Sequence, residues 1–330
     1  MGNDVKAMID IQSVVKRYGN NLAANNVTFS VNEGEIMGFL GPNGAGKTTT
    51  LNILTGYLSS TSGTAKIDGI DILENPIEAK KRIGFLPEQP PLYLDMTVRE
   101  YLYFIFDLKR CKLNKPKHIS EICGVVKISD VLDRMIKNLS KGYRQRVGIA
   151  GALVGNPKVL IFDEPTVGLD PKQIIEIRNL IKQLGRDHTV ILSTHILPEV
   201  QAVCDRIVII NKGVIVANEK TEEITKSVGG PRRFALKVCG PEMEVLKAIR
   251  DTQGVAYAEP LGERDADSRG YLVEGQPNVD IRKPLFNTFA SKGFPMIGIE
   301  AMGVSLEDIF IQLTGAGSDQ KRPNKQTAAK

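Results

Sequence analysis

A glycine-rich segment followed by a lysine and threonines lies between an apolar run at 36–40 and a helix-like run at 48–54. It consists of Gly41, Pro42, Asn43, Gly44, Ala45, Gly46, Lys47, Thr48 and Thr49. The glycines let successive backbone N–H groups point at phosphate oxygens, and the helix presents its positive end to them. Lys47 can reach the β- and γ-phosphates, and the Thr48 hydroxyl can ligate Mg²⁺. This segment therefore predicts a site for a nucleoside triphosphate with magnesium.

Acidic and imidazole side chains follow two further apolar runs. Asp163 and Glu164 come directly after the run at 159–162, and His195 comes just after the run at 189–193. An acid at such a strand end can associate with Mg²⁺, and a second acid can orient and deprotonate a water molecule. Because ligands bind at the carboxyl ends of parallel strands, we expect Asp163, Glu164 and His195 to lie beside Lys47.

Two other segments carry candidate contacts. Ser140, Lys141 and Gly142 open a helix-like run, and a helix start with Ser140 as N-cap is a ready anion site. Tyr18, at the end of an expected strand, is either a platform for an adenine ring or a half-buried strand-end tyrosine. Between these two interpretations the spacing does not choose.

The pattern of elements predicts an α/β fold followed by a smaller α+β unit. Apolar strands alternate with helical runs up to about residue 228, which favours a mostly parallel sheet. Residues 92–138 are expected to form an all-helical insert, with a capping box of Thr97 and Glu100 and a short third helix at 131–135. A glycine pair and a proline at 229–231 mark a boundary. Residues 231–314 follow a split β-α-β plan, ferredoxin-like, with a last helix at 306–313. The tail 315–330 is expected to be disordered.

Composition narrows the class. With 330 residues, the chain is long enough for two domains, and 42% hydrophobic and 25% charged residues are ordinary for a globular protein. No run reaches the roughly 18 apolar residues of a membrane span, so a cytoplasmic protein is expected. The net charge of +5 is dispersed, and no nucleic-acid partner is expected. The four cysteines show no metal-ligand spacing, and two of the histidines, His118 and His188, are expected at the surface.

Taken together and in this order, the motifs resemble the ATP-binding subunit of an ABC transporter, over roughly residues 9–218. The loop ending at Lys47 and Thr48 matches its Walker A motif, residues 159–164 match Walker B with its catalytic glutamate, and His195 matches the switch histidine. Tyr18 falls at the adenine-stacking position. Asp170 lies where the D-loop belongs.

Two motifs depart from the family pattern. The signature reads Leu-Ser-Lys-Gly-Tyr, so Lys141 stands where glycine is usual. The lid segment has Glu88 followed by Gln89 where the family commonly has one glutamine; alignment favours Glu88 as the metal contact, and both remain candidates. These variants, and the C-terminal unit, are similar to the exporter branch that includes gliding-motility and sodium-export ATPases.

The resemblance implies ATP hydrolysis with Mg²⁺ held by Thr48, Asp163 and the lid segment. It implies that two cassettes, identical or paralogous, pair so that Ser140, Lys141 and Gly142 complete the partner's site. A separate membrane permease would dock beside the helical insert, placing the protein on the cytoplasmic face of the membrane, with export as the expected direction. We also hypothesise that Lys141 strengthens γ-phosphate binding across this pair.

The alternative is a cassette ATPase that acts on ribosomes or nucleic acid instead of a permease. Such proteins usually have two cassettes or a long coiled-coil insert, and neither pattern occurs here. A catalytically inactive cassette is disfavoured because Glu164 and His195 are both present. A GTPase is disfavoured because the base-reading motif Asn-Lys-x-Asp does not occur.

Overall fold

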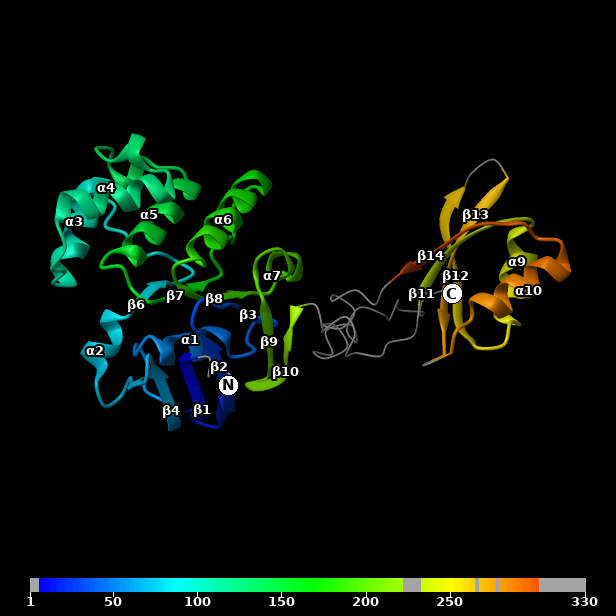
Figure 1. The fold of residues 1–330 in the computed structure, drawn as a ribbon, viewed down its shortest axis with the longest axis horizontal. Coiled ribbons are helices and arrows are strands. Elements are labelled where there is room, and N and C mark those ends of the chain that lie inside the picture. The colour runs from blue at the N-terminus through cyan, green and yellow to red at the C-terminus, as the bar shows by residue number, and fades with distance from the viewer. Residues whose placement is uncertain (1–5, 222–232, 265–266, 277–278, 303–330) are drawn as a thin grey trace, which may run out of the picture. The chain divides into compact units, whose positions relative to one another are not determined.

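The computed structural model describes residues 6–221, 233–264, 267–276 and 279–302 (Figure 1). The chain divides into two units, Met1–Thr221 and Glu222–Lys330. The expected boundary at 229–231, the last helix at 306–313 and the tail at 315–330 lie outside the described residues. Within the described part, no helix is long and apolar enough to cross a membrane.

A six-stranded sheet forms the centre of the first unit, with the strand order β10-β9-β3-β8-β7-β6. Its strands are β3 (Ile36–Leu40), β6 (Ile83–Leu86), β7 (Val159–Asp163), β8 (Thr189–Thr194), β9 (Arg206–Asn211) and β10 (Val214–Lys220). The first five run parallel, and β10 pairs antiparallel with β9. Every residue of β3 and β7 is buried, as expected for parallel strands that are covered on both faces.

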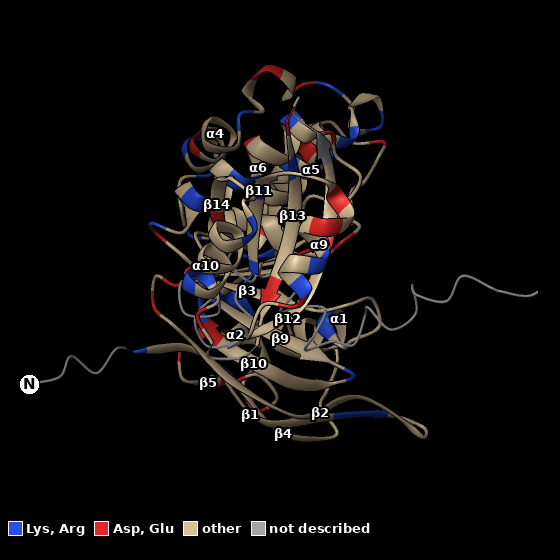
Figure 2. Ribbon diagram, turned by 90° about the vertical axis from the view of Figure 1, so that its right-hand side faces the viewer, with Lys and Arg blue, Asp and Glu red and all other residues tan. Residues whose placement is uncertain are grey.

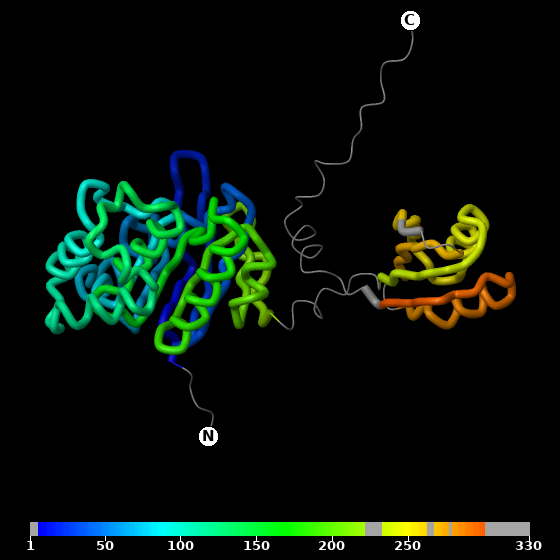
Figure 3. The backbone as a smooth tube through the Cα atoms, turned by 90° about the horizontal axis from the view of Figure 1, so that it is seen from above, coloured from blue at the N-terminus to red at the C-terminus, as the bar shows by residue number. Residues whose placement is uncertain are grey.

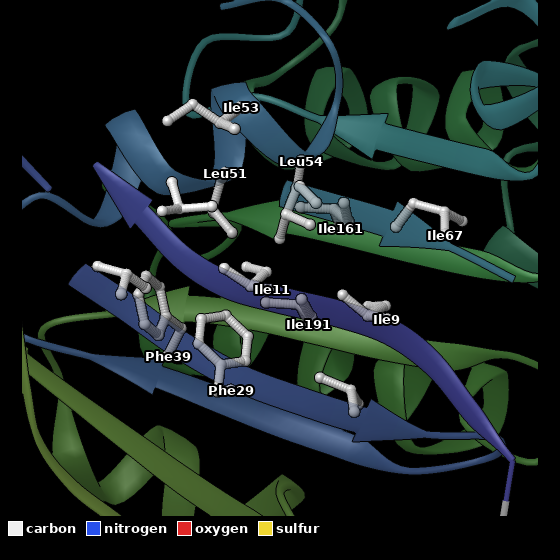
Figure 4. Packing of buried hydrophobic residues seen from close by; sticks show 14 of the residues in the cluster. Ile9, Ile11, Phe29, Phe39, Leu51, Ile53, Leu54, Ile67, Ile161 and Ile191 are labelled. Atoms are coloured by element: carbon white, nitrogen blue, oxygen red, sulfur yellow. The ribbon is translucent and has the colours of Figure 1, made fainter. Parts of the chain in front are cut away.

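A second, antiparallel sheet packs against the first. It has the order β2-β1-β4-β5, built from β1 (Ala7–Tyr18), β2 (Asn21–Asn32), β4 (Ser62–Ile67) and β5 (Ile70–Asp71). Helix α1 (Lys47–Leu54) lies between the two sheets (Figure 1). Figure 4 shows Leu51 and Leu54 of α1 packed among Ile9 and Ile11 of β1 and Ile161 of β7, one continuous apolar cluster.

The β9–β10 hairpin lies against the second sheet, although the two are far apart in sequence (Figures 1 and 3). The N–H of Asn25 in β2 donates to the carbonyl of Gly213 at 2.8 Å, and the N–H of Gly213 donates to Ala45 O at 2.9 Å. The hairpin turn is therefore fastened directly to the phosphate-binding loop.

Helices cover the other side of the large sheet. They are α3 (Val98–Leu108), α4 (Lys115–Val126), α5 (Lys141–Leu153), α6 (Pro171–Leu184) and α7 (Leu197–Val203). Helix α2 (Pro76–Lys81) instead lies on the side of α1, where its Ala79 joins the same apolar cluster (Figure 1). Helix α3 begins with the predicted capping box, in which Thr97 accepts from the Glu100 N–H and Glu100 accepts from the Thr97 N–H. The short helix α7 was not predicted.

One predicted helix of the insert is wrong. Residues 131–135 were expected to form a short third helix, but two 3₁₀ turns, Ser129–Val131 and Ile136–Asn138, occur there. The N–H groups of Ile136 and Lys137 donate to Met96 O and Leu94 O at 2.9 and 3.0 Å. Because these donors pair with the segment before α3, they are not free for helical bonds.

The second unit is a four-stranded antiparallel sheet of order β12-β13-β11-β14 with two helices. Its elements are β11 (Arg233–Cys239), α9 (Glu242–Arg250), β12 (Val255–Arg264), β13 (Ser268–Gly275), α10 (Arg282–Lys292) and β14 (Met296–Met302). This is the predicted split β-α-β plan. Its core contains Phe234, Leu236, Tyr271 and Phe289. Charges of both signs are interspersed, as on α9 in Figure 2.

Candidate active site

The phosphate-binding loop connects β3 to α1. Gly46 is the N-cap of α1 with φ +105°, and a Cβ there would lie 2.2 Å from Ala23 O, so only glycine fits. The first turn of α1 has no acidic side chain. The free N–H groups and the positive end of α1 therefore face the loop without a competing anion.

Lys47 is buried within this loop, with 6% of its surface exposed. Its Nζ donates to Gly41 O at 2.7 Å and to Pro42 O at 3.3 Å, and lies 3.4 Å from Glu164 Oε1. A buried ammonium needs such partners to offset its lost hydration. The loop carbonyls and Glu164 thus hold the Lys47 charge where a phosphate would meet it.

Glu164 is held in an uncommon conformation at the end of β7. Its φ is +49°, in the left-handed region, which costs about 1–3 kcal/mol for a residue other than glycine. Its N–H donates to both O and Oγ of Ser193 at 3.1 Å, and its carboxylate lies 2.9 Å from His195 Nδ1. Together with Lys47, these contacts fix the carboxylate despite the strain.

Asp163, the last residue of β7, is also buried, with 1% exposed. The Ser193 hydroxyl donates to its Oδ1. The adjacent strands β7 and β8 therefore set Asp163, Glu164 and His195 in one row at the carboxyl edge of the sheet, as the sequence predicts.

A pocket of 860 Å³ opens over this row. This volume lies within the range of small-molecule sites. Eleven predicted residues line it: Tyr18, Pro42, Asn43, Gly44, Gly46, Lys47, Thr48, Thr49, Glu88, Glu164 and His195. Tyr18 is 46% exposed, with Lys16 Nζ 5.3 Å from its ring centre. An exposed ring at the pocket rim is available for stacking.

The lid segment divides between two pockets. Glu88 lines the 860 Å³ pocket, whereas Gln89 lines an adjoining pocket of 420 Å³ that Glu88 shares. Of the two candidates, the geometry thus brings Glu88 to the phosphate-binding loop.

The signature residues lie away from this pocket. Ser140 caps α5, accepting from the Tyr143 N–H at 3.4 Å, and lines a third pocket with Gly142. Lys141 lines the 420 Å³ pocket instead, and its Nζ packs against Gly168, where a Cβ would lie only 2.0 Å away. Within one chain, therefore, the Lys141 side chain lies against the loop that follows Glu164, whereas Ser140 and Gly142 line a different pocket.

The remaining predicted residues have visible structural tasks. Asp170 is the N-cap of α6 and accepts from the Gln173 N–H at 2.9 Å. Gly41 and Ala45 belong to the phosphate-binding loop without lining the pocket. A Cβ at Gly41 would lie 2.4 Å from Ile210 O, so this glycine permits close approach of β9.

Lys212 also lines the pocket, although it was not predicted. It lies in the turn between β9 and β10, with φ +48°. The turn reads Asn-Lys-Gly, an ordinary hairpin signal that says nothing of a ligand. The hydrogen bonds of Gly213 with Asn25 and Ala45, which join distant segments of the chain, bring this lysine to the site.

The side chains present fit a magnesium ion. Mg²⁺ prefers oxygen ligands and usually takes one or two from the protein, with phosphates and water supplying the rest. Thr48 and Glu88 line the pocket, and Asp163 is the last residue of β7, directly before the pocket residue Glu164. One hydroxyl and two carboxylates are the hard oxygen donors that this ion requires.

Comparisons with known proteins agree with this geometry. Residues 24–167 match the ABC transporter family. An uncharacterised ABC transporter ATP-binding protein, YxlF of Bacillus subtilis, is 34% identical over 94% of this chain and its own full length. The bacitracin transport ATP-binding protein BcrA of Bacillus licheniformis is 32% identical over 95% of this chain and 99% of its own. The Nod factor export ATP-binding protein I of Burkholderia orbicola is 32% identical over 94% and 97%.

Solved structures show the same fold in the first unit. A dimeric, post-hydrolysis ATP-binding cassette, MJ0796 bound to ADP and phosphate, matches with a TM-score of 0.59 and 29% identity. It covers 65% of this chain and 99% of its own. The predicted α/β cassette fold is thereby confirmed. On the identity and coverage of these relatives, the chain belongs to the ATP-binding proteins of ABC transporters.

Proposed function

We propose that this chain binds and hydrolyses ATP and that it drives export through a separate membrane permease. One observation carries the proposal: the Glu164 carboxylate is held beside the phosphate-binding loop by Lys47 and His195. This is a carboxylate poised next to the place where a γ-phosphate would lie.

The loop residues would bind the triphosphate. Backbone N–H groups at the start of α1 would donate to phosphate oxygens, with Lys47 adding its charge. Tyr18 would stack on adenine, and Lys212 would lie at the pocket rim. Thr48, Asp163 and Glu88 are the proposed ligands of Mg²⁺, which would supply positive charge to offset that of the phosphates.

Glu164 would act as the general base. It would accept a proton from a water molecule that attacks the γ-phosphorus, while the bond to the β-γ bridging oxygen breaks to give ADP and phosphate. His195, at 2.9 Å from Glu164, would orient the carboxylate and contact the γ-phosphate. Lys47 would exchange its ion pair with Glu164 for one with the phosphate, which would free the carboxylate for water.

Two cassettes would be needed for turnover. Ser140 and Gly142 line a pocket separate from the phosphate-binding loop, so they would serve the nucleotide of a second chain. The existence of a dimeric relative, MJ0796, supports this pairing. Asp170, at the start of α6, would then lie at the junction.

The permease would dock in a groove between the helical insert and the large sheet. This 330 Å³ pocket is lined by Phe85, Pro91, Tyr101 and Ile105 among other apolar residues, and by Lys80 and Lys109. Exposed Tyr57 lines its rim, with 78% of its surface accessible. A groove of this kind accepts an apolar segment of a partner protein. The protein would then lie on the cytoplasmic face of the membrane.

Export is supported by the relatives named for Nod factor export and bacitracin transport, which align over nearly the whole chain. The alternative, an ATPase acting on ribosomes or nucleic acid, is not favoured by these relatives. It is retained as an outcome of the experiment below.

The test is ATP turnover by the purified chain and by Glu164→Gln. Loss of a general base is expected to lower kcat by roughly 10²–10⁴-fold while ATP still binds. Glu78→Gln is the matched control, because Glu78 is exposed on α2 and pairs with Lys81 far from the pocket. Equal turnover by Glu164→Gln and the unmodified chain would refute the assigned base.

The proposed association with a membrane permease is tested separately in native cells. Tagged Glu164→Gln, trapped with ATP and solubilised in mild detergent, is expected to co-purify with a multi-spanning membrane protein. Recovery of ribosomes or nucleic acid with no membrane protein would overturn the transport proposal and leave the ATPase proposal standing.

A further inference from the structure

We propose that Glu199 is a positioning residue that holds the loop bearing Glu164 and the loop bearing His195 at a fixed separation. The inference rests on the proposed function, because it concerns the geometry of the same hydrolytic pair. Glu199 lies in α7, four residues after His195, and is 1% exposed. It does not line the nucleotide pocket.

One carboxylate oxygen joins the two loops. Thr166, two residues after Glu164, donates its hydroxyl to Glu199 Oε2 at 2.8 Å. Thr194, directly before His195, donates to the same oxygen at 3.1 Å. Both threonines are buried, with 3% and 0% exposed, so water does not compete for these bonds.

The Thr194 hydroxyl is also oriented from its other side. It accepts from the Ile196 N–H at 3.0 Å, so its own hydrogen is directed to Glu199. Thr194 and Ile196, the residues on either side of His195, are thus both bonded through the Thr194 hydroxyl, which is itself held by Glu199. A shift of Glu199 would therefore move His195 relative to Glu164.

A charge on the neighbouring helix compensates the buried carboxylate. Arg178 Nη2, on α6, lies 3.8 Å from Glu199 Oε1. Glu199 Oε1 and Arg178 Nε are buried without a hydrogen-bond partner among the described residues. Such atoms are costly, and an apolar pair would avoid the cost. The buried Glu199 carboxylate is thus better explained by its positioning of the two loops than by a contribution to stability.

Near-isosteric variants of the threonines test the proposal without disturbing packing. Thr194→Val and Thr166→Val each remove one hydroxyl donor. Since a displacement of about 1 Å can cost 10²-fold in rate, each is expected to lower kcat by roughly 10- to 100-fold with little change in the ATP dissociation constant. Thr194→Ser keeps the hydroxyl and is expected to restore turnover.

Thr252→Val is the matched control, because Thr252 is equally buried in the second unit and donates to Ala248 O at 2.8 Å. It loses a buried hydroxyl in the unit that does not contain Glu164. A fall in kcat for Thr252→Val as large as for Thr194→Val would overturn the proposal. A change confined to ATP affinity, or equal turnover by Thr194→Val and Thr194→Ser, would overturn it too.

A second readout needs no turnover. The chain has three histidines, so ¹⁵N-histidine spectra of the full chain can follow His195 separately from His118 and His188. In Thr194→Val, the His195 ring signals are expected to shift toward those of Glu164→Gln, while the other two stay in place. If Glu164→Gln moves His195 and Thr194→Val does not, the proposal fails.

The two readouts separate this inference from the proposed function. A chain without ATP turnover, in which Thr194→Val still displaces the His195 signals, would refute the ATPase and retain the positioning role. ATP turnover by the unmodified chain, together with His195 signals that do not shift in Thr194→Val, would support the ATPase and overturn the positioning role.

Discussion

Tyr18 stands at the end of β1 with nearly half of its surface exposed at the rim of the nucleotide pocket. This exposure fits both a stacking platform and a half-buried strand-end tyrosine, so the choice between them depends on ATP binding by Tyr18 variants. Lys16, 5.3 Å from the ring centre, covers part of it. Adenine would compete with this lysine or lie on the opposite face.

The stacking interpretation predicts a specific pattern of binding. Tyr18→Ala is expected to weaken ATP binding by about 1–3 kcal/mol, the usual value of one base stacked on an aromatic ring. Tyr18→Phe keeps the ring and should bind like the unmodified chain. Isothermal titration with ATP and with inorganic triphosphate measures this: triphosphate, which has no base, should not distinguish the variants. A loss shared by triphosphate would contradict stacking.

Single residues show how far the sequence could be interpreted. Lys47, Glu164 and His195 were predicted to meet because their motifs end neighbouring strands, and they do. The expectation for His188 is wrong: it is 8% exposed, with Nδ1 2.7 Å from Pro157 O. Its burial depends on a carbonyl from another loop. His118, half-buried, likewise accepts from the Gly155 N–H at 3.0 Å. No local pattern announces such partners.

Lys109 connects the helical insert to α5. It follows α3 and donates to Ala152 O and Val154 O, at 3.3 and 2.8 Å, at the end of α5. A cation here satisfies carbonyls that the helix leaves free. Burial lowers the pKa of the Lys109 ammonium from 10.5 to about 8.

This lowered pKa makes stability depend on pH. Below pH 8 both folded and unfolded chains hold the proton, and the cost of burying the charge is fully present. Between pH 8 and 10.5 only the unfolded chain still holds it, so the free energy of unfolding rises with pH. The expected rise is roughly 1–3 kcal/mol after allowance for partial exposure of the ammonium, and Lys109→Met should lack it.

Urea unfolding at pH 7.5 and pH 10 checks this prediction, with Lys112→Met, at an exposed position, as the control. Contributions of all other side chains to the pH dependence cancel in the difference between variants. Identical pH dependence in Lys109→Met and the unmodified chain would contradict it.

At the scale of elements, the sequence predicted structure correctly where a hydrogen bond joins residues that are near neighbours in the chain. The capping box of Thr97 and Glu100 and the N-cap of Ser140 were predictable because partner and donor are three residues apart. The 3₁₀ turn at Ile136–Asn138 was not, because the N–H groups of Ile136 and Lys137 pair with a segment about forty residues earlier. Helix α7, with seven residues, is too short for a period to be visible.

At the scale of the whole molecule, the described residues form two separate apolar cores. One includes Ile9, Leu51 and Ile161, and the other includes Phe234, Tyr271 and Phe289. The predicted division of labour, with nucleotide binding confined to the first unit, stays a prediction. If it is correct, two thermal transitions are expected, and MgATP should raise the midpoint of only one.

Calorimetry with and without MgATP measures this. At a ligand concentration of about 100 times its dissociation constant, the first unit should gain about 2.7 kcal/mol. Because each core excludes residues of the other, the second transition should stay where it is. An equal shift of both would show that the units unfold together and would contradict the division.

The separation of Lys47 from Ser140 and Gly142, in distinct pockets of the same unit, has a consequence in genetics. A chain with Lys47→Ala and a chain with Ser140→Arg should each be inactive alone if the site forms between two copies. Mixed together, they can assemble one intact composite site from the Ser140 side of the first variant and the Lys47 side of the second. Two defective alleles should then complement each other, which a site contained within one chain would never allow.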